Sequence, residues 1–157
     1  MPIIGADPHG QWCSRAGNKL RRCPASGDEL QTGDCLTGSD LGLGDTNSPW
    51  PDWFTVVSCT QQHIAEVFFA GNAWPQSRAY PGDNAIDNLA DDRCNTAFTA
   101  YDGITSDNSV FTYDFIDPFG SDDWASGDRW LVCVAYMSTS QYPGGAPVDY
   151  SIKGSHQ

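Results

Sequence analysis

Three residues whose side chains commonly carry chemistry lie within eight positions of the sequence, in the stretch SCTQQHIAEVFF: Cys59, His63 and Glu66. Thiolate, imidazole and carboxylate groups are ligands for zinc, and a cysteine near a histidine is a candidate nucleophile. The same spacing also suits a structural turn. The choice between these interpretations depends on the other cysteines and titratable groups, and on the elements that must position them.

A zinc site needs three or four protein ligands, but the other two histidines of the chain stand near its ends. Ser58 lies near His63, yet no nucleophile-elbow motif surrounds it. If Cys59 forms a disulfide, it is neither a thiolate ligand nor a nucleophile. We therefore expect no metal centre and no catalytic set. In this interpretation His63 ties down a turn through a side-chain hydrogen bond, and Glu66 faces water or pairs with a basic residue.

The chain has six cysteines, and no two of them form a C-x-x-C pair. An even number of spread-out cysteines in a small chain is typical of disulfides and of an oxidising compartment outside the cytoplasm. Fifteen pairings are possible. We favour one bond within the first segment, one between neighbouring strands and one that pins a helix to the sheet. These pairs are Cys13–Cys23, Cys35–Cys59 and Cys94–Cys133.

The composition describes a globular and strongly acidic protein. The 157 residues are 39% hydrophobic and 12% aromatic, which suits one domain with an appendage. Residues 1–34 hold four basic and four acidic residues, so the remaining chain carries the whole net charge of −12. Such a surface disfavours nucleic acid and anionic membranes as partners. No apolar run approaches the roughly 18 residues of a membrane span, so membrane attachment would require an anchor outside the printed sequence.

The first residues, MPIIGADPHGQW, lack the basic and apolar regions of a signal peptide. The disulfide pattern nevertheless predicts an extracytoplasmic protein, either secreted or membrane-anchored outside the cell. We therefore expect that a signal or anchor has been removed, or that the protein leaves the cell by another route, for example as part of a virus particle.

The pattern of elements predicts an α+β fold, in which one amphipathic helix packs on a face of an antiparallel, disulfide-stabilised sheet. Residues 1–33 are predicted to be an irregular arm with a local disulfide, and residues 34–157 to be the α+β domain. Strands are expected around Cys35, and over residues 53–59, 63–69, 109–115, 129–137 and 148–154. The second and third of these would form a hairpin, the last would be an edge strand, and residues 122–128 would be a turn.

The one long helix is predicted over residues 83–103. Its apolar residues recur at steps of three and four, and Gly103 suits the left-handed conformation that ends a helix. Asp83 or Asn84 would accept hydrogen bonds at its start. We expect its acidic residues, Asp102 included, on the polar face.

Carboxylate pairs are a further candidate for chemistry. Asp91-Asp92 is expected on the polar face of the helix and Asp122-Asp123 in a turn. Neither pair has the ligand spacing of a calcium loop. Two carboxylates that flank a groove would hydrolyse sugars, but the sequence places no such pair around a groove.

Three tryptophans are candidates for a contact surface. Trp50 and Trp53 fall in a loop rich in proline, and Trp74 falls in the loop after the predicted hairpin. Exposed aromatic residues in loops anchor partners or sugars, whereas the alternative is that these side chains cover a sheet face that the helix leaves open.

Five segments follow one another in an order that resembles the actinobacterial septum formation family. They are GDC at 33–35, SCTQQHIAEV at 58–67, the helix after YPGD with Cys94, WASGDRWLVC at 124–133 and YSIKGS at 150–155. The resemblance covers about residues 33–155 and implies an extracytoplasmic domain, usually behind an anchor or signal. It marks His63, Glu66, Gly127, Asp128 and Arg129 as residues of the structural motif. The family name suggests a link to cell division.

These observations favour a non-enzymatic extracytoplasmic module for interaction or assembly, linked to the cell envelope or division. Its partner would be a protein or a cell-wall polymer at the surface, and no cofactor is implied. Two alternatives stay open. One is a secreted hydrolase or carbohydrate-binding module for cell-wall polymer, and the other is a structural component of a virion or surface assembly.

Overall fold

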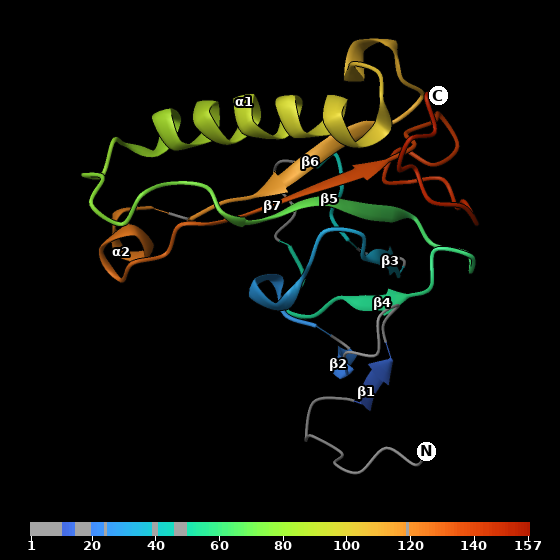
Figure 1. Ribbon diagram of the computed structural model, residues 1–157, viewed down its shortest axis with the longest axis horizontal. Helices are drawn as coiled ribbons and strands as arrows, with labels where there is room; N and C mark the ends of the chain where they lie inside the picture. Colours follow the sequence, from blue (N-terminus) through green and yellow to red (C-terminus); the bar gives the residue numbers. More distant parts are fainter. Residues whose placement is uncertain (1–10, 15–19, 24, 39–40, 46–49, 119) are drawn as a thin grey trace.

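A computed structural model of the chain contains a five-stranded sheet, a long helix across one of its faces and a two-stranded sheet (Figure 1). The structure describes residues 11–14, 20–23, 25–38, 41–45, 50–118 and 120–157, with the backbone alone for the first two ranges.

The strands are β1 (Gln11–Ser14), β2 (Leu20–Cys23), β3 (Cys35–Thr37), β4 (Thr55–Val57), β5 (Ala65–Asn72), β6 (Thr112–Ile116) and β7 (Trp130–Tyr136). The helices are α1 (Asp83–Asp102) and α2 (Gly120–Ala125), with short 3-10 turns η1 (Gly27–Glu29) and η2 (Ser106–Asn108). The predicted α+β class, with an antiparallel sheet and one main helix, is confirmed. Part of the arm that we expected to be irregular forms the β1–β2 sheet.

The five-stranded sheet has the order β4-β3-β5-β7-β6, and every neighbouring pair is antiparallel. The predicted hairpin between residues 53–59 and 63–69 is wrong, because β3 lies between these two strands. Leu36 of β3 pairs with Val56 on one side and with Ala65 on the other. A three-residue link suggests adjacent strands, but the backbone hydrogen bonds of β3 are satisfied by both neighbours.

Two other local predictions also fail. Residues 148–154 do not form an edge strand, since Val148 makes only an isolated bridge with His63. The predicted turn at residues 122–128 begins as the short helix α2, which buries Trp124. The side chain of Trp124 thus favours one helical turn where the Asp, Ser and Gly residues alone indicated a loop.

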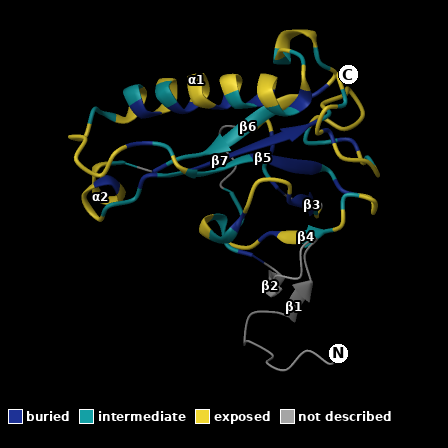
Figure 2. Ribbon diagram, in the orientation of Figure 1, coloured by how far each residue is buried: buried dark blue, intermediate teal, exposed yellow. Residues whose placement is uncertain are grey.

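Helix α1 has the bounds that the apolar spacing predicts. It ends at Gly103, which has a positive φ of 100°, but Gly82 and not Asp83 or Asn84 is its N-cap. One side of the helix faces the sheet, and that side is buried along its length (Figure 2). Asp102 is a correction to the predicted polar face, because it is buried at the end of the helix.

Strand β7 separates two hydrophobic clusters, because its side chains alternate between the sheet faces. Leu131, Cys133 and Ala135 pack under α1. Val132 and Val134 pack on the opposite face, which loop residues such as Leu30 and Phe54 cover. The two layers of core lie on either side of one strand, so β7 is buried along nearly its whole length (Figure 2).

Two disulfides join the elements as predicted. Cys35–Cys59 links β3 to the turn after β4, and Cys94–Cys133 links α1 to β7. The predicted pair Cys13–Cys23 lies outside the residues whose side chains the structure describes. The second bond fixes the helix on the sheet, and the first fixes the two strands at the other edge.

Candidate functional site

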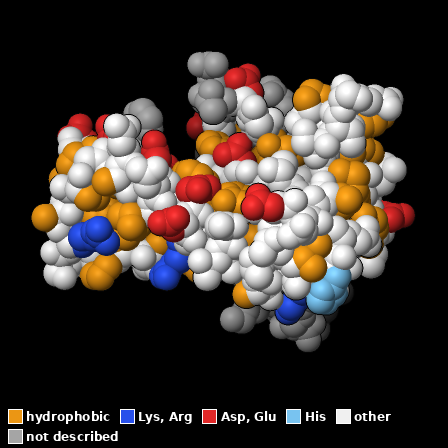
Figure 3. All heavy atoms as spheres, turned by 90° about the horizontal axis from the view of Figure 1, so that it is seen from above, with side chains coloured by type: hydrophobic (Ala, Val, Ile, Leu, Met, Phe, Trp, Pro, Cys, Tyr) orange, Lys and Arg blue, Asp and Glu red, His pale blue; other side chains and the backbone are white. Residues whose placement is uncertain are grey.

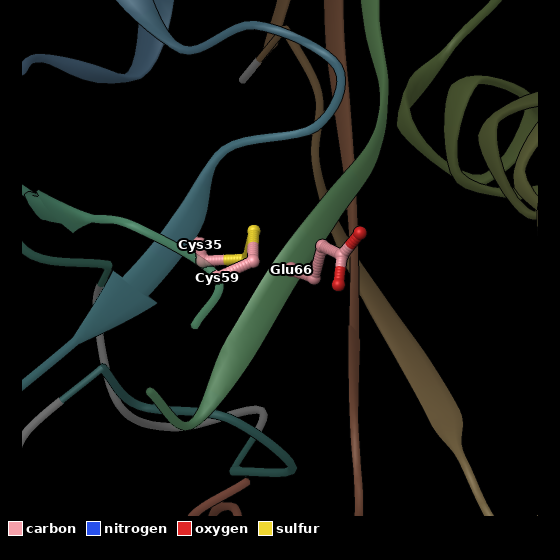
Figure 4. A group of neighbouring side chains, drawn as sticks. All are labelled: Cys35, Cys59 and Glu66. Carbon is pink, nitrogen blue, oxygen red and sulfur yellow. A yellow bond between two sulfur atoms is a disulfide. The ribbon is translucent and has the colours of Figure 1, made fainter. Parts of the chain in front are cut away.

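Cys59, His63 and Glu66 do not form a catalytic or metal-binding set in this structure. Ligand atoms of Cys35, Cys59 and Glu66 lie within 4.8 Å of one another, but the two sulfurs are bonded to each other. A disulfide offers no thiolate to a metal or to a substrate. Figure 4 shows the Glu66 side chain extending from β5 away from this disulfide.

His63 holds the turn that precedes β5. Its Nδ1 donates a hydrogen bond to the carbonyl oxygen of Gln61, at 2.8 Å, and its backbone pairs with Val148. The ring is 1% exposed, and Nε2 has no hydrogen-bond partner among the described residues. The side-chain hydrogen bond that we predicted for the turn is therefore present.

Glu66 neither faces water nor pairs with a basic residue, so that prediction is wrong. It is 1% exposed and accepts three hydrogen bonds: from the Tyr101 hydroxyl at 2.6 Å, from the Ser151 hydroxyl at 2.7 Å and from the Ile152 amide at 2.8 Å. The pKa of the Tyr101 hydroxyl is raised well above its usual value, mainly by burial and secondly by its hydrogen bond to the Glu66 carboxylate. Glu66 therefore connects β5, α1 and the C-terminal segment.

Asp102 makes a second buried connection to the same segment. Its carboxylate accepts hydrogen bonds from the hydroxyls of Ser109 and Ser155 and from the backbone amide of His156. The segment YSIKGS is thus held by two buried carboxylates.

Arg129, the last residue of the motif WASGDR, organises the loop at residues 75–78. Its guanidinium donates to five carbonyl oxygens, three of which belong to Pro75, Gln76 and Arg78. It also lies over the Trp124 ring, with its central carbon 3.7 Å from the ring centroid. Because all its donors are used by backbone, Arg129 fixes the path of this loop.

The other residues of the motif act on the same loop. The Trp124 indole donates to the carbonyl oxygen of Arg78 at 2.9 Å, and the Gln76 amide donates to that of Gly127 at 3.0 Å. Gly127 has a φ of 95°, which a residue with a side chain rarely adopts. Asp128 caps the start of β7 by accepting from the Trp130 amide. The motif therefore holds the 75–78 loop against α2 and β7.

Arg78 of this loop, residues 73–74 and α1 line an open hollow of about 330 Å³, which we call the arginine pocket. Its lining includes the side chains of Trp74, Arg78, Leu89, Asp92, Arg93 and Thr96. The pocket combines apolar walls with two cations, a carboxylate and a hydroxyl, as small-molecule sites commonly do.

Arg78 and Arg93 are exposed, and their charges are not neutralised by an ion pair with any carboxylate that the structure describes. Arg93 makes a weak contact of 3.5 Å with the carbonyl oxygen of Ala73 and lies 5.8 Å from the centroid of the Phe69 ring. Figure 3 views the molecule from the α1 side, where basic side chains lie among apolar ones on the left. Both guanidinium groups are available to a ligand.

The three tryptophans of the predicted contact surface lie in different environments. Trp74 is 7% exposed and packs against Trp124, so it is not an exposed anchor, although it lines the arginine pocket. Trp50 is partly buried against Phe54, with ring centroids 6.1 Å apart. Trp53 is 38% exposed. The expected role of Trp50 and Trp53 in contact stays a prediction.

Acidic residues also meet between α1 and β6. Burial, together with the nearby carboxylates of Asp87 and Asp83, raises the pKa of Asp117 to about 7. Elsewhere between these two elements, the Tyr113 hydroxyl of β6 donates a hydrogen bond to the Asp91 carboxylate of α1 at 2.8 Å. Asp91 and Asp92 therefore do not act as a pair, because one contacts β6 and the other lines the arginine pocket.

The family relationship follows from comparison with known sequences. The sequence profile described as septum formation matches residues 32–155. The chain belongs to the septum formation family. The match begins near the GDC segment and includes every septum formation motif whose contacts are described above.

Two relatives of this septum formation domain are uncharacterised membrane proteins of Mycobacterium tuberculosis, from strains CDC 1551 / Oshkosh and ATCC 25618 / H37Rv. Each is 30% identical to the chain over 167 aligned positions. The alignments cover 98% of this chain and 34% of each relative, so the chain spans about a third of their length. No solved structure matches the chain significantly. Within the described residues, no helix has the length and apolar content needed to cross a bilayer.

Sequence reasoning did not identify Arg78 and Arg93 as candidate site residues. The signal that would have found them is their scarcity, since residues 35–157 contain only four basic residues: Arg78, Arg93, Arg129 and Lys153. In a segment so rich in acids, two exposed arginines on neighbouring elements are unusual enough to be examined together.

Proposed function

We propose that this septum formation domain is a non-enzymatic binding module that works outside the cytoplasm, at the cell envelope. Its disulfides support an oxidising compartment, and its relatives are membrane proteins. The family description supports a role connected with cell division or the envelope.

One observation carries the proposal that the domain binds rather than catalyses: the motif residues are engaged in holding the fold. Cys59 is bonded to Cys35, Glu66 accepts three hydrogen bonds, and Arg129 donates five. The arginine pocket, in contrast, presents charged and polar side chains that the fold does not use. Among its described lining residues, Asp92 is the only carboxylate, whereas hydrolysis of a sugar polymer uses two.

Trp53 and Trp50 supply a second proposed contact for the same partner or for another copy of the chain. Trp53 is one of the few large apolar side chains among the described residues that are more than a third exposed, and Trp50, three positions earlier, packs against Phe54. Aromatic side chains at the centre of an interface commonly contribute about 2 kcal/mol or more to binding.

The experiment that tests this proposal is a sedimentation assay with insoluble cell-wall polymer purified from a mycobacterium. The oxidised chain should sediment with the polymer and release no soluble sugar or peptide fragments, as measured by chromatography of the supernatant. Reduced and alkylated chain is the control for adsorption of unfolded protein. Release of fragments in proportion to the amount of chain would establish the hydrolase alternative, and a chain that stays in the supernatant would refute a polymer-binding module.

A further inference from the structure

We infer that the arginine pocket binds the anionic group of an acidic sugar, either a carboxylate or a phosphate, with Arg78 and Arg93 as its ligands. This inference deepens the proposed function and rests on it, because it names the chemistry of the cell-envelope ligand.

The first reason is the charge of the pocket relative to the rest of the molecule. A net charge of −12 repels anions over most of the surface. Arg78 from the loop and Arg93 from α1 nevertheless line one hollow. Guanidinium groups match the planar, two-oxygen geometry of carboxylates and phosphates, which makes arginine the usual residue for such ligands. An anion bound in this hollow would accept hydrogen bonds from both guanidinium groups.

The second reason is that the rest of the pocket fits a ring with hydroxyl groups. Trp74 and Leu89 form apolar walls, against which the C–H face of a sugar packs. The Asp92 carboxylate accepts hydrogen bonds from hydroxyls, and the Thr96 hydroxyl, which donates its own proton to the Asp92 carbonyl oxygen at 3.0 Å, can accept another. An inorganic anion would leave these groups and most of the 330 Å³ unused. A wholly apolar ligand would desolvate two arginines without giving them a partner.

The third reason is that the family motif builds the pocket. Arg129 and Trp124 fix the carbonyl oxygens of residues 75–78, and so place Arg78 opposite α1. The disulfide Cys94–Cys133 fixes the helix next to Arg93 on the other side. A site whose two walls are held in this way loses little conformational entropy when a ligand binds.

The test uses the oxidised chain and four simple probes: glucuronate, glucose 1-phosphate, glucose and inorganic phosphate. Nuclear magnetic resonance titration would follow the backbone amides of residues 73–78 and 89–96. We expect glucuronate, glucose 1-phosphate or both to shift these signals with millimolar affinity, and glucose to bind at least about tenfold more weakly. The two charged sugars distinguish a carboxylate source from a phosphate source, and either supports the inference.

The double variant R78A/R93A should lose at least about tenfold in affinity for the charged sugar. K153A is the matched control, because Lys153 is exposed and stands outside the pocket. If the double variant folds poorly, R93E alone tests the same contact by reversing one charge on the exposed side of α1.

Three results would overturn the inference: no shifts with any probe up to about 50 mM, equal binding of glucose and glucuronate, or unchanged affinity in the arginine variants. Inorganic phosphate that binds as tightly as glucose 1-phosphate would overturn the sugar assignment. The inference can fail while the proposed function stands, since a chain that sediments with cell-wall polymer regardless of both arginines is still a binding module, but one that uses another surface.

Discussion

Glu66 is a buried carboxylate whose hydrogen-bond donors come from two distant parts of the chain, the end of α1 and the C-terminal segment. A carboxylate with three donors is satisfied, and its donors belong to buried Ile152, partly buried Tyr101 and exposed Ser151. This single side chain therefore determines where residues 150–152 lie against the sheet.

Replacing Glu66 by glutamine should lower the free energy of unfolding by about 2–3 kcal/mol. The NH₂ group of glutamine is a donor, so it would face hydroxyl or amide donors that now bind a carboxylate oxygen. Urea unfolding at neutral pH measures this effect. D52N is a control, since Asp52 is exposed. A loss below about 0.5 kcal/mol in E66Q would mean that the hydrogen bonds of Glu66 contribute little to stability.

There is a physical reason why the sequence alone did not reveal Glu66 as a buried hydrogen-bond acceptor. Alternation along residues 63–69 predicts a strand, but Phe68 and Phe69 both pack toward α1 because the register shifts between Val67 and Phe69. A bulge of this kind changes which side chains face the helix. The burial of the Glu66 side chain also depends on its hydrogen-bond partners Tyr101 and Ser151, which are 35 and 85 residues away in the sequence.

Asp117 should make stability depend on pH. The pKa of this carboxyl is raised to about 7 by burial first and by the Asp87 and Asp83 carboxylates next, against 3.8 for the ordinary group. The folded chain therefore binds more protons than the unfolded chain between these values, and stability falls as pH rises from about 4 to 7. It levels off above pH 7.

D117N should remove this dependence and stabilise the chain at pH 8 by about 1–2 kcal/mol, a figure reduced for solvent screening because the carboxyl is partly exposed. Thermal unfolding at pH 5 and pH 8 measures the effect, with D52N as the control. Equal pH dependence in D117N and in the unmodified chain would contradict the assignment.

At the scale of elements, the 75–78 loop depends on Arg129. R129K should lower the free energy of unfolding by about 2–3 kcal/mol, because lysine has three donors for the five carbonyl oxygens and no planar group to lie over Trp124. Hydrogen exchange should also become faster in the loop. R93K is the control on an exposed position, and an R129K loop with unchanged exchange would contradict the role.

Elements with a strong local signal were predicted well, and the connections between them were not. Helix α1 has continuous periodicity and a terminal glycine, so its extent was readable. Strand β4 is three residues long, and its choice of β3 over β5 depends on a segment that lies about 20 residues earlier in the chain. Residues 148–154 alternate like a strand, yet Ser151 and Ile152 donate to the Glu66 carboxylate instead of joining a strand ladder.

At the scale of the whole molecule, the two disulfides among the described side chains differ in their access to solvent. Cys94 and Cys133 are completely buried, whereas Cys59 is partly exposed next to β3. Mild reduction should therefore open Cys35–Cys59 before Cys94–Cys133, since a thiolate must reach the sulfur that it attacks. Mass spectrometry after partial reduction and alkylation gives the order. Earlier labelling of Cys94 would contradict the described packing.

Each bond should contribute about 3–4 kcal/mol by restricting the unfolded chain. These two cysteine pairs were predictable because one joins neighbouring strands and the other joins the apolar face of the helix to a buried strand. The arginine pocket was not predictable in this way. Arg78 and Arg93 are 15 positions apart on different elements, and they line one pocket because Arg129 holds the loop and the disulfide holds the helix.

The most direct test of the account compares how the unmodified chain and R78A/R93A bind purified cell-wall polymer, with melting temperature recorded for both. The account predicts that the unmodified chain binds without releasing fragments, and that the double variant binds at least about tenfold more weakly at an unchanged melting temperature. Equal binding by both chains, or release of fragments by either, would contradict it.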